Sequence, residues 1–255
     1  MNFFDDLAMV YKKAMSETVS KISKNPVVLL LPLIYSLIYK VAMNAFSIAI
    51  APVLGFLSGF ILPIISSLIL SSYYSQLSDV IFYNRLNFRN FKDTFKEYFA
   101  SIYSVYFILI LISWLMPALS SMGPLFLVVS LVLVIAFNPI AESIYIRGEY
   151  YTSAYSHSLE FMKENFVLWS LPFIIYLIIL NLLGVPFENY ILTSGIIDIP
   201  LGLNTEGTIV MGASLVNVKQ IIIILVTAIY AIFRGNLYKI LHNSTRRKRA
   251  YMGEI

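Results

Sequence analysis

The chain has no cysteine, and this absence removes several classes of site at once. Disulfide bonds, iron–sulfur clusters, thiolate metal sites and a cysteine nucleophile are all excluded. Histidine is almost as scarce, because only His157 and His242 occur, far apart in the sequence. No zinc-protease, serine-hydrolase or nucleotide-binding motif is present. The sequence therefore predicts a protein that is not an enzyme and that needs no metal or other cofactor.

Charged residues are also few, at 13% of the chain against about 25% in soluble domains. Apolar residues make up 59% and gather in stretches of the roughly 20 residues that cross a bilayer core. The predicted fold is all-α and integral to the membrane, with about six transmembrane helices. Their expected ranges are 27–50, 53–78, 101–119, 122–141, 166–183 and 218–241. We interpret 1–255 as one polytopic domain that ends in a basic cytoplasmic tail, 242–255.

Lysine and arginine lie on one side of these predicted spans. The connections around residues 51 and 120, and the segment 184–217, carry none. The basic residues lie in the N-terminal segment, the other two connections and the C-terminal segment, and include Lys12, Lys13, Lys21, Lys24, Arg85, Arg89, Lys92, Lys96, Arg147, Lys163, Arg234 and Lys239. Because such segments resist translocation, we expect a cell-membrane protein with both termini in the cytoplasm. The net charge of +4 gives no reason to expect a nucleic-acid partner.

Three of the basic segments also place apolar residues at helical spacing, and they begin near Phe3, Phe88 and Tyr151. We expect each to be an amphipathic helix that lies in the headgroup layer or packs under the bundle. Since each precedes two predicted spans, we interpret the chain as three repeats of an amphipathic helix plus a transmembrane hairpin, at 1–82, 83–147 and 148–241. The alternative is that membrane composition alone produces the similarity.

The segment 144–169 contains Tyr-Ile-Arg-Gly, then Ser-x-x-Phe-Met-Lys-x-Asn-Phe, and leads into a span with a proline. It resembles the cytoplasmic linker of a loose group of bacterial and archaeal polytopic membrane proteins. That group includes the membrane domain found beside some glycerophosphodiester phosphodiesterases. In those proteins the chemistry belongs to a separate soluble barrel, which this sequence does not contain. The resemblance therefore implies a membrane domain and no phosphodiesterase activity or catalytic residue.

Lys40 is the strongest candidate for an intramembrane site. It lies about 20 Å along a helix that begins at Val27, at 1.5 Å per residue. An ionisable side chain at such depth costs at least about 2.5 kcal/mol, which favours a functional role. Lys40 would then be a proton-coupled group or a ligand for an anion or headgroup, with Asn44 one turn further on. The alternative is that the helix tilts or ends early and Lys40 reaches the outer interface.

Asp79 and Glu142 occupy matching places in the proposed repeat, near the cytoplasmic ends of two spans. Arg85 and Arg147 follow them shortly afterwards. We expect interfacial ion pairs that anchor the helix ends. The alternative is that these pairs line an inward-facing cavity for a charged substrate.

Other polar and small residues suggest helix contacts and lipid contacts. Asn138 and Asn181 are expected to hydrogen-bond between helices. Gly55-x-x-x-Gly59 leaves a flat surface for a neighbouring helix, either within the chain or in a homo-oligomer. The tail residues Arg246, Arg247, Lys248 and Arg249 are expected to contact anionic lipids and to act as a topological signal.

These features favour a non-enzymatic membrane protein that binds or transports a lipid-like or amphipathic molecule, alone or as a transporter subunit. The expected partners are membrane lipids, especially anionic ones. Active transport would need a partner ATPase or an ion gradient, because no nucleotide-binding motif is present. The alternative is a structural or regulatory membrane partner, a scaffold without a substrate.

Overall fold

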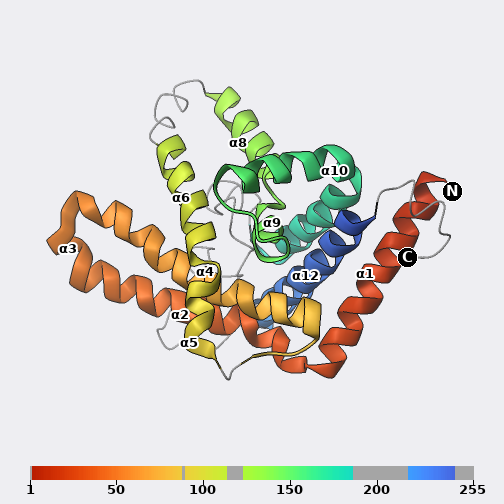
Figure 1. The fold of residues 1–255 in the computed structure, drawn as a ribbon, viewed down its shortest axis with the longest axis horizontal. Helices are drawn as coiled ribbons and strands as arrows, with labels where there is room; N and C mark the ends of the chain where they lie inside the picture. The colour runs from red at the N-terminus through yellow and green to blue at the C-terminus, as the bar shows by residue number, and fades with distance from the viewer. Residues whose placement is uncertain (1, 88–89, 114–122, 186–217, 245–255) are drawn as a thin grey trace.

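The computed structural model describes residues 2–87, 90–113, 123–185 and 218–244. Within these ranges the regular elements are all helical, as predicted, and no strand occurs. Figure 1 shows their arrangement. The helices are α1 (Phe3–Lys24), α2 (Leu31–Ala45), α3 (Ala51–Leu54), α4 (Ser58–Tyr83), α5 (Phe91–Glu97), α6 (Phe99–Ser113), α8 (Pro124–Ala136), α9 (Ile140–Tyr145), α10 (Tyr151–Leu182) and α12 (Val218–Asn243).

Four helical segments of the described chain are long and apolar enough to cross a membrane. They are Pro26–Leu54, Ser58–Tyr83, Tyr151–Leu182 and Ile221–Asn243. The first begins with a 3₁₀ turn, Pro26–Leu30, and continues through α2, a π-helical turn, Phe46–Ile50, and α3. These segments correspond to four of the six predicted spans. The chain is therefore an all-helical membrane protein.

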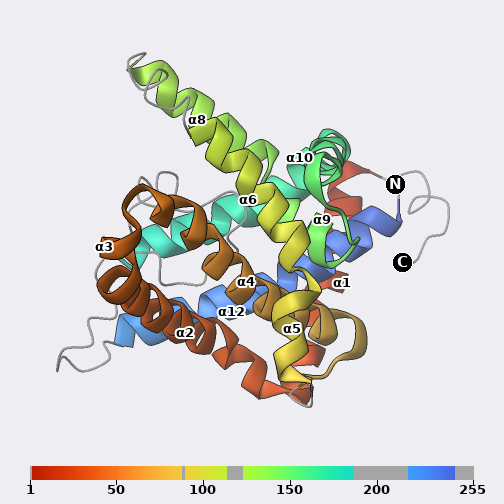
Figure 2. The ribbon, with the colours of Figure 1, turned by 60° about the vertical axis from the view of Figure 1, so that its left-hand side comes forward.

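The other two predicted spans coincide with shorter helices. α6 ends at Ser113 and α8 begins at Pro124, so parts of the ranges 101–119 and 122–141 lie outside the described residues. A turn before α9 interrupts the second range, where Pro139 has no N–H to continue the helical ladder. Both helices project from the rest of the bundle (Figures 1 and 2). The structure thus leaves the count of six spans and the threefold repeat unconfirmed.

The predicted junction between an amphipathic helix and a span falls inside α10. Asn165 departs from helical geometry, with φ −123° and ψ 18°, and its side chain donates a hydrogen bond to the carbonyl of Phe161 at 3.2 Å. A side chain that bonds the backbone one turn earlier competes with the helical ladder and favours a kink. The amphipathic part and the membrane-crossing part are therefore joined by a kink.

α1 packs a face of mixed polarity against the bundle. Met15 and Val19 are exposed. The buried residues, which recur at three- and four-residue spacing, are Asp6, Val10, Ala14, Thr18 and Lys21. The ammonium of Lys21 donates to Oδ1 of Asn236 on α12, and Nδ2 of Asn236 donates to Oγ1 of Thr18 at 3.0 Å. Polar pairing with α12 therefore sets the orientation of α1.

α12 lies at the centre of the bundle and packs against α1, α2, α4 and α10. Gly235 allows this close approach. A Cβ at that position would overlap Cδ1 of Ile81 on α4 and would lie 3.0 Å from the hydroxyl oxygen of Tyr145 on α9. The absence of a Cβ therefore leaves room for Ile81 and Tyr145 where α4, α9 and α12 meet.

Polar side chains attach α5 to α4. Oγ of Ser71 donates to the carbonyl of Thr94 at 2.8 Å and accepts from the backbone N–H of Tyr98 at 2.9 Å. Oγ of Ser72 lies 2.7 Å from the hydroxyl of Thr94 and 2.7 Å from that of Tyr35. The serines of α4 thus satisfy the polar groups of the short helix beside it.

Candidate functional site

A buried ion pair joins α9 and α12 inside the bundle. Nε of Arg234 donates to Oε1 of Glu142 at 2.6 Å, and Nη2 donates to Oε2 at 2.7 Å. Arg234 is 2% exposed and Glu142 is 0% exposed. Two parallel hydrogen bonds satisfy both carboxylate oxygens and fix the guanidinium plane. Each charge at this depth depends on the other for compensation.

Further contacts hold the guanidinium in place. Nη2 of Arg234 also donates to the carbonyl of Asn138 at 2.7 Å. The group lies over the rings of Trp169 and Tyr230, 5.2 Å and 5.7 Å from their centroids. Nε1 of Trp169 donates to Oδ1 of Asn138 at 2.9 Å. Asn138 therefore links α12 to α10, and its side chain accepts the interhelical hydrogen bond.

The position of α9 corrects the pairing expected for Glu142. α9 turns Glu142 into the bundle toward Arg234, whereas Arg147 lies beyond the end of α9 and is exposed. Arg147 pairs with Glu149 instead, at 2.9 Å. Arg234 itself was grouped with the surface charges that set orientation, and its burial removes it from that group.

Both histidines lie in the surface cluster around Arg147. Nε2 of His242 is 2.8 Å from Nη1 of Arg147, and Nε2 of His157 is 3.1 Å from Oε1 of Glu149. The cluster connects the end of α12 to the beginning of α10. Within the described residues, no group of three His, Cys, Asp or Glu side chains could hold a metal ion.

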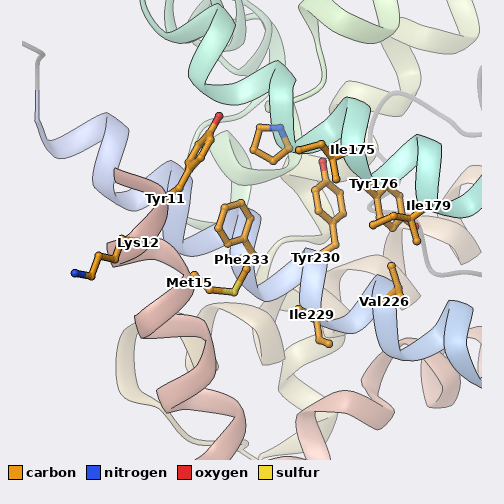
Figure 3. A pocket seen from close by; sticks show the side chains of 11 residues that line it. Tyr11, Lys12, Met15, Ile175, Tyr176, Ile179, Val226, Ile229, Tyr230 and Phe233 are labelled. Atoms are coloured by element: carbon orange, nitrogen blue, oxygen red, sulfur yellow. The ribbon is translucent and has the colours of Figure 1, made fainter. Parts of the chain in front are cut away.

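A groove of about 510 Å³ lies between α1, α10 and α12 (Figure 3). Its lining is almost entirely apolar. α1 contributes Tyr11, Lys12 and Met15 at one end, and Ile179 and Val226 lie at the other end. This volume falls within the roughly 300–1,000 Å³ typical of small-molecule sites.

The groove follows two candidate membrane spans. It extends from Pro172 to Ile179 on α10 and from Phe233 to Val226 on α12. Seven residues at 1.5 Å each give a length of about 10 Å. Half of a bilayer's hydrocarbon core measures about 15 Å. The groove is therefore long enough to hold a substantial part of one leaflet's acyl chain.

A proline and a tyrosine define the end of the groove near α1. Pro172 has no N–H, so the carbonyl of Leu168 one turn earlier lacks its helical partner. The hydroxyl of Tyr11 donates to this carbonyl at 2.9 Å. Burial raises the pKa of the Tyr11 phenol, which keeps the hydroxyl protonated and able to donate. The bond holds α1 against α10.

Aromatic rings separate the groove from the buried ion pair. Tyr230 stacks on Tyr176 with ring centroids 4.1 Å apart and planes at 5°. Both rings line the groove, and Tyr230 also lies beside Arg234. The hydroxyl of Tyr176 is 3.0 Å from that of Thr227. The groove and the ion pair thus share one wall.

The candidate intramembrane lysine lies away from both features. Lys40 is partly exposed and Asn44 is exposed. Neither lines the groove. The carbonyl of Asn44 accepts a hydrogen bond from Ser47 at 3.0 Å, a contact within its own turn. The structure therefore brings Lys40 into no site with other polar side chains among the described residues.

The remaining predicted residues are also scattered. Asp79 is partly buried, and within the described chain it forms no ion pair with Arg85. Arg85 is exposed and lies over the ring of Tyr83. Asn181 is exposed near the end of α10. The tail residues Arg246, Arg247, Lys248 and Arg249 lie outside the described residues.

The two glycines of the predicted packing motif do not share one helix. Gly55 has a positive φ of 51° and ends α3, and Gly59 belongs to α4. A Cβ at either position would meet nothing within 4 Å. Gly55 therefore serves a turn, which favours glycine because φ is positive, and no helix of the described chain packs closely there.

The sequence contained evidence for the ion pair, but Arg234 was counted among the cytoplasmic charges that set orientation. Arg234 falls within a predicted span and Glu142 directly follows another, and ionisable residues of opposite sign at such places are expected to pair. The groove carried no such signal, because it combines helices that lie more than 150 residues apart in the chain, as Tyr11 and Leu168 show.

Comparison of the chain with protein-family models, with curated proteins and with solved structures finds no match. The fold and the position of the groove define its class: an all-helical membrane protein with an apolar groove on two of the four candidate spans found among the described residues.

Proposed function

We propose that the protein binds a lipid-like or amphipathic molecule of the membrane in the groove between α1, α10 and α12, alone or as a transporter subunit. One observation carries the proposal. The groove is apolar along two candidate spans and has a single charged residue, Lys12, at one end. A molecule with an apolar chain and a polar head matches this distribution.

The surroundings of the groove support entry from the lipid phase. Ile174 and Ile178 on α10 and Ile222 and Leu225 on α12 are exposed apolar side chains on the same two spans. A hydrocarbon chain that moves from the bilayer into the groove gains no hydrophobic driving force, since both surroundings are apolar. Selectivity then depends on packing in the groove and on contacts made by the head.

We extend the proposal to the topology predicted from the sequence, with six spans and both termini in the cytoplasm. The one-sided distribution of lysine and arginine supports it. Because the chain has no cysteine, single cysteines can report the orientation directly. A membrane-impermeant maleimide should label Thr193→Cys in intact cells and Ser20→Cys only after permeabilisation. The reverse labelling pattern would overturn this orientation.

The binding proposal is tested by filling the groove. Ile229 lines the groove and is partly open to its surroundings, so Ile229→Trp should occupy the space of an acyl chain. Ile178 is similarly exposed on a candidate span and does not line the groove, which makes Ile178→Trp the matched control. Native mass spectrometry of the purified proteins after mild delipidation measures the lipid retained.

The wild type and Ile178→Trp should retain one lipid at fixed stoichiometry, and Ile229→Trp should lose it. Equal retention in all three proteins would contradict binding in this groove. Loss of every lipid without selectivity in the wild type would favour the scaffold alternative.

A further inference from the structure

We propose that the molecule in the groove is a phospholipid with a net negative charge, and that Lys12 holds its headgroup. This inference rests on the proposed function and adds the chemical class of the ligand. It starts from the polarity of the groove. Figure 3 places Lys12 at the end formed by α1, with its ammonium directed away from the other labelled side chains, and places Ile179 and Val226 at the far end.

The ammonium of Lys12 is available to a ligand. Lys12 is exposed, and it forms no ion pair or hydrogen bond with any residue of the described chain. None of the residues that line the groove is acidic. The carboxylates of α1 are engaged elsewhere: Asp6 is buried and has a contact of its own, Asp5 accepts from the N–H of Asn2 at 3.1 Å, and Glu17 pairs with Lys21 at 3.6 Å. An anionic head would therefore meet a free positive charge.

The geometry favours a lipid of the bilayer over a soluble anion. Ile175 of α10 and Ile229 of α12 line the groove and are also exposed on candidate spans, so the groove is open to the hydrocarbon region. The length of about 10 Å suits an acyl chain that lies along the spans. A phosphate without a chain would leave the apolar part of the groove empty.

The experiment presents the purified protein with equal amounts of phosphatidylglycerol and phosphatidylcholine that carry identical acyl chains. Native mass spectrometry then gives the ratio of the two bound lipids. One lysine near a lipid surface contributes about a fivefold preference for the anionic lipid. The wild type should show a ratio on the order of five in favour of phosphatidylglycerol.

Three variants test whether the preference for phosphatidylglycerol arises from Lys12 and from binding in the groove. Lys12→Gln should retain lipid with a ratio near one, since it keeps the groove and removes the charge. Lys13→Gln removes a neighbouring charge of α1 that does not line the groove, and it should keep the wild-type ratio. Ile229→Trp should lose both lipids. Thermal melting confirms that each variant is folded.

The outcomes distinguish the two proposals. A wild-type ratio near one, an unchanged ratio in Lys12→Gln, or an equal loss of preference in Lys13→Gln would overturn the assignment of the headgroup while leaving lipid binding intact. Full retention of both lipids by Ile229→Trp would overturn the proposed function itself.

Discussion

Arg234 and Glu142 form a bidentate ion pair at 2.6 Å and 2.7 Å in the interior of the bundle, between helices more than 90 residues apart in the chain. Their surroundings are mostly aromatic: Trp169 and Tyr230 lie over the guanidinium, and Tyr145 lies beside the carboxylate. Few side chains there could compensate either charge alone. The pair therefore behaves as one structural unit.

Glu142→Gln should be strongly destabilising. The substitution keeps the shape of the side chain and leaves the buried Arg234 without its counter-charge, which costs about 3–5 kcal/mol. The double variant Glu142→Gln/Arg234→Met should recover much of this loss, because no uncompensated charge remains. Thermal unfolding in detergent, followed by circular dichroism, measures the difference.

Glu149→Gln provides the control for this pair. Glu149 pairs with the exposed Arg147, and such surface pairs contribute only about 0–1 kcal/mol. If Glu142→Gln were no more destabilising than Glu149→Gln, the buried pair would not hold α9 against α12.

The ion pair also shows where sequence analysis succeeds and where it stops. The apolar stretches predicted an all-helical membrane protein with about six spans, and four of these correspond to helices of the described chain that are long and apolar enough to cross a membrane. Sequence spacing placed Arg147 as the partner of Glu142, because it follows soon after in the chain. Only the three-dimensional packing of α9 against α12 shows that Arg234 is the partner.

α1 illustrates the same limit. Its apolar spacing left open whether α1 lies in the headgroup layer or packs under the bundle. In the structure the ammonium of Lys21 donates to Asn236, and the side chain of Asn236 donates to Thr18, so polar contacts hold α1 against α12. The spacing of apolar residues within one helix does not reveal hydrogen bonds to a residue more than 200 positions away in the sequence. The groove depends on this orientation, so it could not have been predicted from the periodicity of α1 alone.

Tyr11→Phe should destabilise the protein by about 1–2 kcal/mol, because the carbonyl of Leu168 loses the donor that replaces the missing N–H of Pro172. In a Pro172→Ala background, an N–H of α10 itself can reach this carbonyl. The cost of Tyr11→Phe should then fall, giving a coupling of about 1 kcal/mol in a double-mutant cycle of unfolding free energies.

Tyr155→Phe is the matched control for this cycle. The hydroxyl of Tyr155 also donates to a backbone carbonyl, that of Val105, at 2.9 Å. This bond is unrelated to Pro172, so the cost of Tyr155→Phe should be the same in both backgrounds. A Tyr11→Phe cost that is also independent of Pro172 would show that the proline does not create the need for Tyr11.

Gly235→Ala should be destabilising by about 1–3 kcal/mol, since the new methyl group overlaps Cδ1 of Ile81 in a closely packed region. Ile81→Val removes that carbon, so the double variant should recover much of the loss in thermal unfolding. Gly59→Ala is the control, because a Cβ there meets nothing within 4 Å. A loss in Gly59→Ala as large as in Gly235→Ala would mean that helix geometry, and not the contact with Ile81, causes the effect.

Lys21 should make stability depend on pH in a defined direction. Burial lowers the pKa of its ammonium from 10.5 to about 8, against a smaller opposing effect of Glu17. Below about pH 8 the folded and unfolded chains both carry the charge, so the cost of burying it is present in full. Between about pH 8 and 10.5 the folded protein loses this proton first, and the unfolded chain binds more protons. Stability therefore rises with pH in this window.

The measurement compares the apparent unfolding free energy of the wild type with that of Lys21→Met from pH 7 to 10. The upper limit avoids the titration of tyrosines in the unfolded chain, whose usual pKa is about 10. The wild type should gain stability relative to Lys21→Met by at most about 1.4 kcal/mol per pH unit, beginning near pH 8. A difference that stays flat or falls with rising pH would mean that the Lys21 ammonium is not penalised by its burial against Asn236.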